Sequence, residues 1–222
     1  MEKMPYQPQP DVEPVASTVP PAQSERRSND WRTGLPELAG SLVTLRELRT
    51  NDAASLFTAM MNAEVTRFIS PPPATVEGFE RFIAWTHRQR AAGQSVSFAI
   101  VERGSDVAIG LFQVRSIDLD FATAEWGFAI GYEFWGSGLI VDGARLVIEF
   151  AFDVIGTHRL EARTAVMNTR GNSVLKKLGA VREGVLRKSF LRHGEFLDQS
   201  LWTLLADEWR DAQLPVVSQV VH

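Results

Sequence analysis

The pattern of apolar and polar positions divides the chain into three parts. Residues 1–34 are rich in Pro, Gln, Ser and charged side chains and contain few large apolar groups. Such a segment cannot bury enough surface to offset the entropy cost of ordering. From residue 35 onward, apolar side chains recur at strand and helix spacing. We therefore predict a flexible Pro-rich N-terminal tail (1–34), one folded domain (35–210) and a C-terminal tail (211–222).

The first half of the folded region predicts a strand, two helices and an antiparallel meander. Asn51 or Asp52 is expected to cap the first helix, and Thr75 and Glu77 open the second. Short turn signals rich in Gly, Ser and Asp then separate three strand-like runs. The expected elements are a strand at 41–49, a helix to about residue 61, a helix from 75 to about 93, and strands at 95–101, 107–117 and 123–134.

The second half predicts a crossover helix followed by strands and a hairpin. The helix that begins after Gly138 keeps its polar residues on one stripe, so it should pack against a sheet. A helix at 171–177, closed by Gly179, and a hairpin about His193 and Gly194 follow. The expected strands are 160–166, 185–191 and 196–204. This order predicts an α/β (α+β) fold with a mixed, mostly antiparallel seven-stranded sheet and helices on both faces.

Composition and charge exclude several classes of protein. The formal net charge is -4, so the chain has no excess of basic residues for binding nucleic acid. It contains no cysteine, which excludes a thiol nucleophile and thiolate metal sites. Its four histidines show no helical metal-site spacing, so no metal is expected. The first residues lack a secretory signal, and residues 139–155 are too charged to span a bilayer. We therefore expect a cytoplasmic protein without a membrane partner.

A glycine-rich turn between a strand and a helix carries the clearest chemistry. The turn reads Trp135-Gly-Ser-Gly-Leu. N–H groups at a helix start have no intrahelical acceptor, and the helix dipole favours negative charge. Residues 135–140 are therefore expected to bind a pyrophosphate, with Gly136 and Gly138 allowing close approach. Taken alone, Gly-x-Gly also fits a tight turn that binds nothing.

Two other phosphate-binding motifs do not fit this turn. A Rossmann motif requires a third glycine where Val141 stands, and a repeated βαβ series in place of the preceding meander. A P-loop requires a Lys-Ser or Lys-Thr pair after the glycines, and none follows. The turn is therefore assigned to neither class.

Several segments together resemble the GNAT (GCN-related N-acetyltransferase) superfamily. The resemblance covers roughly residues 35–210 and is closest to the branch that includes the ribosomal-protein-alanine N-acetyltransferases. It implies the GNAT fold, with a sheet splayed at its fourth and fifth strands, and an acyl-CoA co-substrate, either acetyl-CoA or a larger acid such as succinyl-CoA. The matching segments are Val43-Thr-Leu-Arg-Glu-Leu with Asp52, Ile130-Gly-Tyr, Trp135-Gly-Ser-Gly-Leu, Asn168 and Leu175-Lys-Lys-Leu-Gly-Ala.

The resemblance also implies where the acyl-CoA binds. Gly131 inside the fourth strand suggests a bulge that leaves the main chain before it open to pantetheine, with one N–H near the thioester carbonyl. Asn168 and Asn172 match positions that face the cofactor arm, although Asn168 also fits a helix cap. The implied CoA-binding residues are Phe128, Ala129, Ile130, Trp135, Gly136, Ser137, Gly138, Leu139, Ile140, Asn168 and Asn172.

Catalytic residues are less clearly implied. Ribosomal-protein members carry a proposed acid and base, Ser and Glu, where this chain has Gly171 and Phe190. Neither role can be carried over. Glu125 and Glu161, on the two splayed strands, are candidate bases acting through water, and Tyr132 could protonate the departing thiolate. A strand glutamate is also commonly just solvated or ion-paired.

The function predicted is direct transfer of an acyl group from acyl-CoA to a primary amine, either a protein N-terminus or a lysine. Alternatives left open are acylation of a small-molecule amine, a catalytically silent acyl-CoA-binding regulatory module, and a structural oligomer that binds no cofactor. Residues 79–87 are expected to wall the acceptor pocket. The carboxylate of a succinyl donor could be bound by Arg163 or by one of the basic residues near the final hairpin, Arg182, Arg187, Lys188 and Arg192. We also expect a homo-oligomer.

Overall fold

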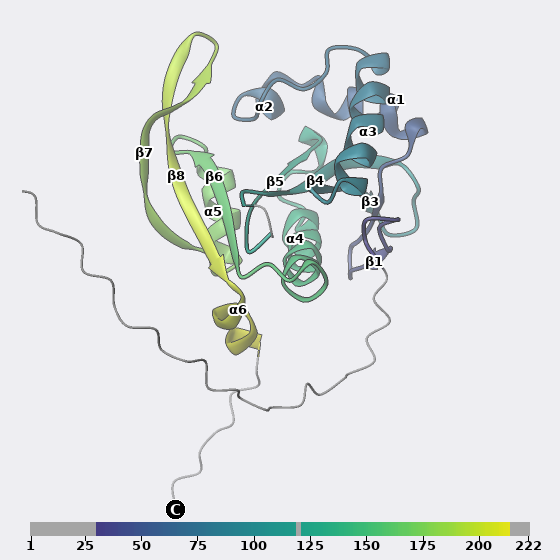
Figure 1. Ribbon diagram of the computed structural model, residues 1–222. Coiled ribbons are helices and arrows are strands. Elements are labelled where there is room, and N and C mark those ends of the chain that lie inside the picture. Colours follow the sequence, from purple (N-terminus) through teal and green to yellow (C-terminus); the bar gives the residue numbers. More distant parts are fainter. Residues whose placement is uncertain (1–29, 119–120, 214–222) are drawn as a thin grey trace, which may run out of the picture.

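The computed structural model describes residues 30–118 and 121–213 (Figure 1). Most of the predicted N-terminal tail and residues 214–222 lie outside this part of the chain. Trp31, which we assigned to the tail, is buried and packs edge-on against Phe121 with the ring centroids 5.6 Å apart. Packed structure therefore starts before the predicted boundary at residue 35. At the other end, helix α6 (Ala206–Gln213) runs past the predicted boundary at residue 210.

The described residues form one mixed sheet of eight strands, in the order β1-β2-β3-β4-β5-β6-β8-β7, with helices on both of its faces. All neighbouring strands are antiparallel except β5 and β6. The strands are β1 (Leu38–Ala39), β2 (Val43–Glu47), β3 (Ser95–Glu102), β4 (Ala108–Ser116), β5 (Thr123–Ile130), β6 (Arg159–Ala165), β7 (Val181–Arg192) and β8 (Glu195–Leu205). The α-helices are α1 (Ala53–Met60), α2 (Ala63–Thr66), α3 (Val76–Ala91), α4 (Leu139–Phe150), α5 (Thr169–Lys177) and α6. Shorter turns are η1 (Thr50–Asp52), η2 (Tyr132–Phe134) and the π-helical η3 (Ala151–Ile155).

The predicted fold class is confirmed, but the predicted number of seven strands is wrong by one. The additional strand is β1, which pairs its two residues, Leu38 and Ala39, with Leu45 and Thr44 of β2. Two residues are too few to show the alternation of apolar and polar positions by which a strand is recognised. Its pairing with β2 defines it as a strand.

Two hydrophobic clusters occupy the opposite faces of the sheet. Strand β3 contributes alternate residues to each: Phe98 and Ile100 to the first cluster, Ala99 and Val101 to the second. This is the two-residue period of a strand that is buried on both faces. Helix α4 covers the first face and helices α1 and α3 cover the second (Figure 1). The site described below lies where these layers meet the diverging strands.

Helix starts follow the expected capping chemistry in part. Thr75 caps α3 as predicted, because its hydroxyl accepts the N–H of Gly78 at 3.0 Å. Asp52 stands at the N-cap of α1, but its carboxylate instead binds the buried guanidinium of Arg46 at 2.7 and 2.8 Å. Hydrogen bonding to Asp52 raises the pKa of Arg46. Asp52 therefore ties β2 to the turn that precedes α1.

Strands β5 and β6 diverge soon after they begin. Their parallel pairing covers only Thr123 to Glu125 of β5 against Arg159 to Glu161 of β6. Beyond these residues β5 continues to Ile130 along β4, and β6 continues to Ala165 along β8. The sheet is therefore splayed between the two strands, as predicted.

The predicted bulge at Gly131 is not the cause of this divergence. The β4–β5 register runs without a shift up to the pair of Gly110 with Ile130, and Gly131 lies just beyond the strand. The carbonyl of Gly131 accepts the N–H of Phe134 at 3.1 Å and closes the turn η2. The glycine thus ends the strand instead of bulging it.

The hairpin of β7 and β8 projects beyond the rest of the sheet (Figure 1). Its turn residues, His193 and Gly194, both have positive φ, 49° and 80°. This geometry matches the right-handed twist of the strands and confirms the predicted turn. Across residues 30–118 and 121–213, no helix is long and apolar enough to cross a membrane.

Candidate active site

The glycine turn before α4 presents unpaired backbone N–H groups. Gly136 and Gly138 have φ of 79° and 89°, a conformation that strongly favours glycine. Within the described part of the chain, the N–H groups of Gly136, Gly138, Ile140 and Val141 have no hydrogen-bond acceptor. They lie at the N-terminus of α4, whose dipole favours negative charge. The turn can therefore bind an anion through its main chain.

Not every N–H group predicted to be free is free. The N–H of Trp135 is bound by the carbonyl of Tyr132 at 3.1 Å, and that of Ser137 by the carbonyl of Phe134 at 3.5 Å. The Ser137 hydroxyl also lies within the turn and contacts the N–H of Leu139 at 3.4 Å. These three groups stabilise the turn itself, so Ser137 and Leu139 do not offer the contacts predicted for them.

A cavity of about 640 Å³ adjoins this turn. Four segments of the chain line it: α2 with the residues after it, the end of β5, the glycine turn with the start of α4, and the β6–α5 connection with α5. The lining residues are Glu64, Val65, Arg67, Phe68, Ile69, Phe128, Ala129, Ile130, Phe134, Trp135, Gly136, Gly138, Ile140, Val141, Met167, Asn168, Thr169, Arg170, Gly171, Ser173, Val174 and Lys177.

The end of β5 offers main-chain groups to this cavity at alternate residues. Hydrogen bonds from Ile117 N–H to Thr123 and from Gly131 N–H to Ile109 bracket the β4–β5 ladder. Alternation between them directs the N–H and C=O of Ala129 toward β4, and those of Phe128 and Ile130 toward the splayed side. Of the three residues predicted to offer main-chain groups, only Phe128 and Ile130 can do so.

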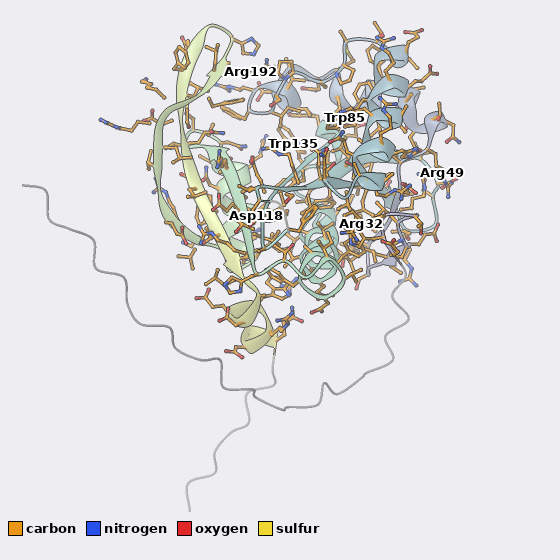
Figure 2. All side chains as sticks on the ribbon, viewed as in Figure 1. Arg32, Arg49, Trp85, Asp118, Trp135 and Arg192 are labelled. Atoms are coloured by element: carbon orange, nitrogen blue, oxygen red, sulfur yellow. The ribbon has the colours of Figure 1, made fainter. Side chains whose placement is uncertain are left out.

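Trp135 connects the end of β5 to α5. Its indole N–H donates to the Ile130 carbonyl at 3.2 Å, so that carbonyl is occupied. The guanidinium of Arg170 lies over the indole ring, 4.3 Å from its centroid. Figure 2 shows Trp135 between the strands and the helices of the upper part of the molecule. Arg170 and Lys177, both on α5, bring positive charge to this wall of the cavity.

The two predicted asparagines differ in what they can bind. Asn168 lines the cavity and caps α5, because its side-chain oxygen accepts the N–H of Gly171 at 3.0 Å. Asn172 lies outside the lining, and its amide donates to the carbonyls of Ala165 and Asn168 at 3.0 and 2.7 Å. Its oxygen accepts the indole N–H of Trp202 at 2.9 Å. Asn172 therefore joins β6, α5 and β8, and is not free to meet a cofactor as predicted.

The three candidate catalytic residues do not line the cavity. Glu125 is bound by Arg115 of the neighbouring strand β4 at 2.6 Å. Glu161 lies beside Glu125 across the β5–β6 pairing and is bound by Arg159 at 3.0 Å. Tyr132 is 46% exposed and packs against Trp135 outside the cavity. The two glutamates are therefore ion-paired, which is the common role of a strand glutamate that we left open beside a catalytic one.

Residues 79–87, which we predicted to wall the acceptor pocket, do not reach this cavity, and α2 with the residues that follow it lines the cavity on one side. No residue of 79–87 lines the cavity, whereas Glu64, Arg67 and Phe68 do. Helix α2 has only four residues and escaped prediction. Its sequence signal was Asn62, whose side chain accepts the N–H of Glu64 at 2.8 Å and caps the helix.

Among the described residues, no three or more His, Asp or Glu side chains are grouped so that they could hold a metal ion. What the cavity combines is a helix N-terminus with open N–H groups, a strand edge with open main-chain groups, and cationic side chains. This combination suits a long ligand with phosphates at one end and amides along its length.

Comparison with known proteins agrees with this geometry. The acetyltransferase (GNAT) domain matches residues 43–181. The chain belongs to the GNAT acetyltransferase family. As a GNAT member it is an N-acetyltransferase, and the predicted resemblance to this family is confirmed.

Individual GNAT relatives match over most of their length. N-acetyltransferase p20 of Bacillus licheniformis is 28% identical over 168 residues, 75% of this chain and 94% of its own. Spermidine N(1)-acetyltransferase of Escherichia coli is 28% identical, covering 69% of this chain and 81% of its own. The [ribosomal protein uS5]-alanine N-acetyltransferase of E. coli is 23% identical, covering 81% and 96%. The structure of Mycobacterium smegmatis RimJ in complex with CoA-disulfide has the same fold, with a TM-score of 0.72, 19% identity, and coverage of 81% of this chain and 90% of its own.

Proposed function

We propose that this GNAT protein transfers an acetyl group from acetyl-CoA directly to a primary amine. The observation that carries the proposal is that one cavity joins the open N–H groups of the glycine turn to the open edge of β5. A thioester with a phosphate-bearing arm can lie along both at once. The names of the relatives and the CoA bound to RimJ support this donor.

The donor is proposed to bind in two parts. Its pyrophosphate meets the N–H groups of Gly136, Gly138, Ile140 and Val141 at the start of α4. Its pantetheine arm lies in the splay and bonds the N–H and C=O of Phe128 and the N–H of Ile130. The amide N–H₂ of Asn168, which has no acceptor among the described residues, completes this wall together with Arg170 and Lys177. Ser137, Leu139 and Asn172 are not kept as donor contacts.

The chemistry proposed is direct transfer within a ternary complex. The neutral amine attacks the thioester carbonyl, and the N–H of Phe128 or Ile130 stabilises the oxyanion that forms. Collapse breaks the C–S bond and releases the CoA thiolate. No enzyme nucleophile is required, and the chain has no cysteine to act as one. Since Glu125, Glu161 and Tyr132 lie outside the cavity, none of them is kept as acid or base.

The acceptor class is proposed in two forms. The relative that acts on ribosomal protein uS5 supports a protein N-terminal amine, and the spermidine relative supports a small polyamine. The side-chain amine of a protein lysine is kept as a variant of the first form, because it is also an amine of a protein. Use of succinyl-CoA as an alternative donor, cytoplasmic location and a homo-oligomer stay predictions.

The test measures donor binding and turnover on the full chain. We expect CoA and acetyl-CoA to raise the melting temperature, because a ligand that binds only the folded state stabilises it. Gly138→Trp should abolish the shift by filling the anion site, whereas Gly104→Trp, also at positive φ and facing open space, should not. A succinyl-CoA arm tests the alternative donor.

Release of CoA with a panel of peptides and polyamines then identifies the acceptor. Acyl-CoA binding without turnover on any amine would favour a silent acyl-CoA-binding module. Absence of any shift with all three ligands would refute the proposal, and would favour a protein that binds no cofactor here.

A further inference from the structure

Among the described residues that line the cavity, Glu64 contributes the only carboxylate. The other charged groups of the lining are cationic: Arg67 beside it, and Arg170 and Lys177 on α5. The α5 cations share a wall with the anion site of the glycine turn, which suits a phosphate-bearing donor. Glu64 stands instead on α2, and α2 does not take part in that anion site.

The backbone of Glu64 is fixed, and its carboxylate accepts no hydrogen bond from the described residues. Its backbone N–H donates to the side chain of Asn62 at 2.8 Å, which fixes the start of α2. The nearest cation is Arg67, one helical turn away, at 4.0 Å. No side-chain hydrogen bond joins the two in the described structure, and the Arg67 guanidinium packs over the ring of Phe68, 5.1 Å from its centroid.

Other carboxylates near the splay differ in this respect. Glu125 and Glu161 are bound by arginines at 2.6 and 3.0 Å and lie outside the cavity. The side chain of Glu64 is 55% exposed and keeps its oxygen lone pairs free to accept hydrogen bonds. It therefore combines access to the cavity with capacity to accept a proton or bind an amine.

On the basis of the function proposed above, we infer that Glu64 is the acceptor-binding carboxylate of the transfer reaction. It accepts a hydrogen bond from the attacking amine. As the C–N bond forms, the nitrogen becomes positive and the thioester oxygen negative. Glu64 takes the proton that the nitrogen loses and passes it to solvent, while the C–S bond breaks and the thiolate leaves.

This role gives a stronger interaction in the transition state than in the ground state. A neutral amine interacts weakly with a carboxylate, whereas the positive nitrogen of the tetrahedral intermediate interacts strongly. The same charge selects among acceptors. An amine with a carboxylate next to it is repelled by Glu64, so the substrate class is a primary amine in neutral or cationic surroundings, such as a polyamine or the N-terminus of a basic peptide.

The inference is tested by Glu64→Gln, which removes the charge and keeps the shape. We expect kcat/KM for the best amine to fall about 100-fold, the effect typical of losing a general base. The KM for acetyl-CoA should change by less than twofold. The thermal shift with CoA should be unchanged within error. Glu64→Asp should retain more activity than Glu64→Gln. Glu80→Gln, on the exposed side of α3 and outside the lining, is the matched control and should behave as the unaltered chain.

The failure of this inference differs from failure of the proposed function. If the unaltered chain turns over an amine and Glu64→Gln keeps its kcat/KM within twofold, Glu64 is not the acceptor-binding group, although the acetyltransferase stands. If Glu64→Gln loses CoA binding as well, its effect is structural and the inference is overturned. If the unaltered chain shows neither CoA binding nor turnover, the proposed function and the inference fall together.

Discussion

Arg192, the last residue of β7, donates two hydrogen bonds to the backbone carbonyl of Thr66, the last residue of α2. The distances are 3.1 Å from Nε and 2.8 Å from a terminal nitrogen. Figure 2 shows Arg192 on the hairpin, on the side that faces α2. Because carbonyls at a helix end lack intrahelical donors, this contact satisfies one of them. It also ties the hairpin to the segment that walls the cavity.

We expect Arg192→Ala to release α2 from the hairpin without unfolding the domain. Both hydrogen bonds come from one charged guanidinium. A half-buried hydrogen bond of this kind contributes about 1 kcal/mol to the free energy of unfolding after screening by solvent. Amide hydrogen exchange should therefore speed up at residues 64–69, and the KM for the amine should rise. Arg187→Ala, exposed on the same strand, is the control. Unchanged exchange at residues 64–69 would show that the contact does not restrain α2.

The parts of the fold that the sequence predicted correctly depend on local signals. The hairpin turn needs positive φ at two adjacent residues, and His193-Gly194 supplies them. Helix α3 begins at a capping Thr75, and the glycine turn before α4 places glycine at both of its positive-φ positions. Each signal lies within a few residues of the feature it specifies.

The parts that were missed depend on strand register or on contacts between distant segments. Glu125 forms an ion pair with Arg115 only because β4 and β5 pair in one particular register. Asn172, on helix α5, accepts a hydrogen bond from the indole of Trp202, thirty residues away on strand β8. Helix α2 has too few residues to show a helical period. Its residues are recognised as a cavity wall only once the splayed sheet beside them is known. The contacts of Glu125 and Asn172 leave no local pattern, and α2 leaves only its Asn62 cap.

Asn172 should be a residue of stability and not of cofactor binding. Asn172→Ala leaves the indole N–H of Trp202 without its acceptor. It also removes one of two donors from the carbonyls of Ala165 and Asn168, which keep the backbone N–H groups of Asn168 and Asn172. A buried polar group left without a partner costs about 1–3 kcal/mol, so we expect a loss of about 2 kcal/mol in the free energy of unfolding. Denaturant titration measures it, with exposed Asn51→Ala as control. An unchanged denaturation midpoint together with weakened CoA binding would instead make Asn172 a cofactor-binding residue.

The bidentate pair of Arg159 and Glu183 predicts a pH dependence of stability. Hydrogen bonds from Arg159, at 2.8 and 2.6 Å, lower the pKa of Glu183 to about 2. The unfolded value is about 4.3, so the folded pKa is the lower one. The stabilisation is then complete above the unfolded pKa and is lost as the pH falls toward the folded one.

We therefore compare the melting temperatures of the unaltered chain and Glu183→Gln across pH. Their difference should be constant from about pH 7 to about pH 5 and should shrink below about pH 4. Because Glu183 is 40% exposed, solvent screens the pair and the difference should be modest. Glu195→Gln, exposed beyond the hairpin turn, is the control. A difference that grows on acidification would contradict the assigned direction of the pKa shift.

A side chain at residue 171 should be incompatible with the observed position of the Asn168 side chain. A Cβ at residue 171 would lie 2.6 Å from the amide nitrogen of Asn168 and 3.0 Å from the hydroxyl oxygen of Thr164. Elsewhere in a helix, replacing Gly by Ala stabilises by about 1 kcal/mol, because alanine loses less backbone entropy. Here the clash displaces the asparagine that caps α5, so we expect Gly171→Ala to lower the melting temperature and to weaken acetyl-CoA binding.

A double-mutant cycle separates the clash from the change in helix propensity. Asn168→Ala alone should cost about 1 kcal/mol through the lost cap. With that side chain already shortened, only the hydroxyl of Thr164, at 3.0 Å, crowds the new Cβ. The effect of Gly171→Ala should then be less destabilising than in the unaltered chain. Such non-additivity is the result expected from the close approach of the two residues. Additive effects, or a stabilising Gly171→Ala with Asn168 present, would show that the connection between β6 and α5 relaxes, and that Asn168 is not fixed where the donor is proposed to meet it.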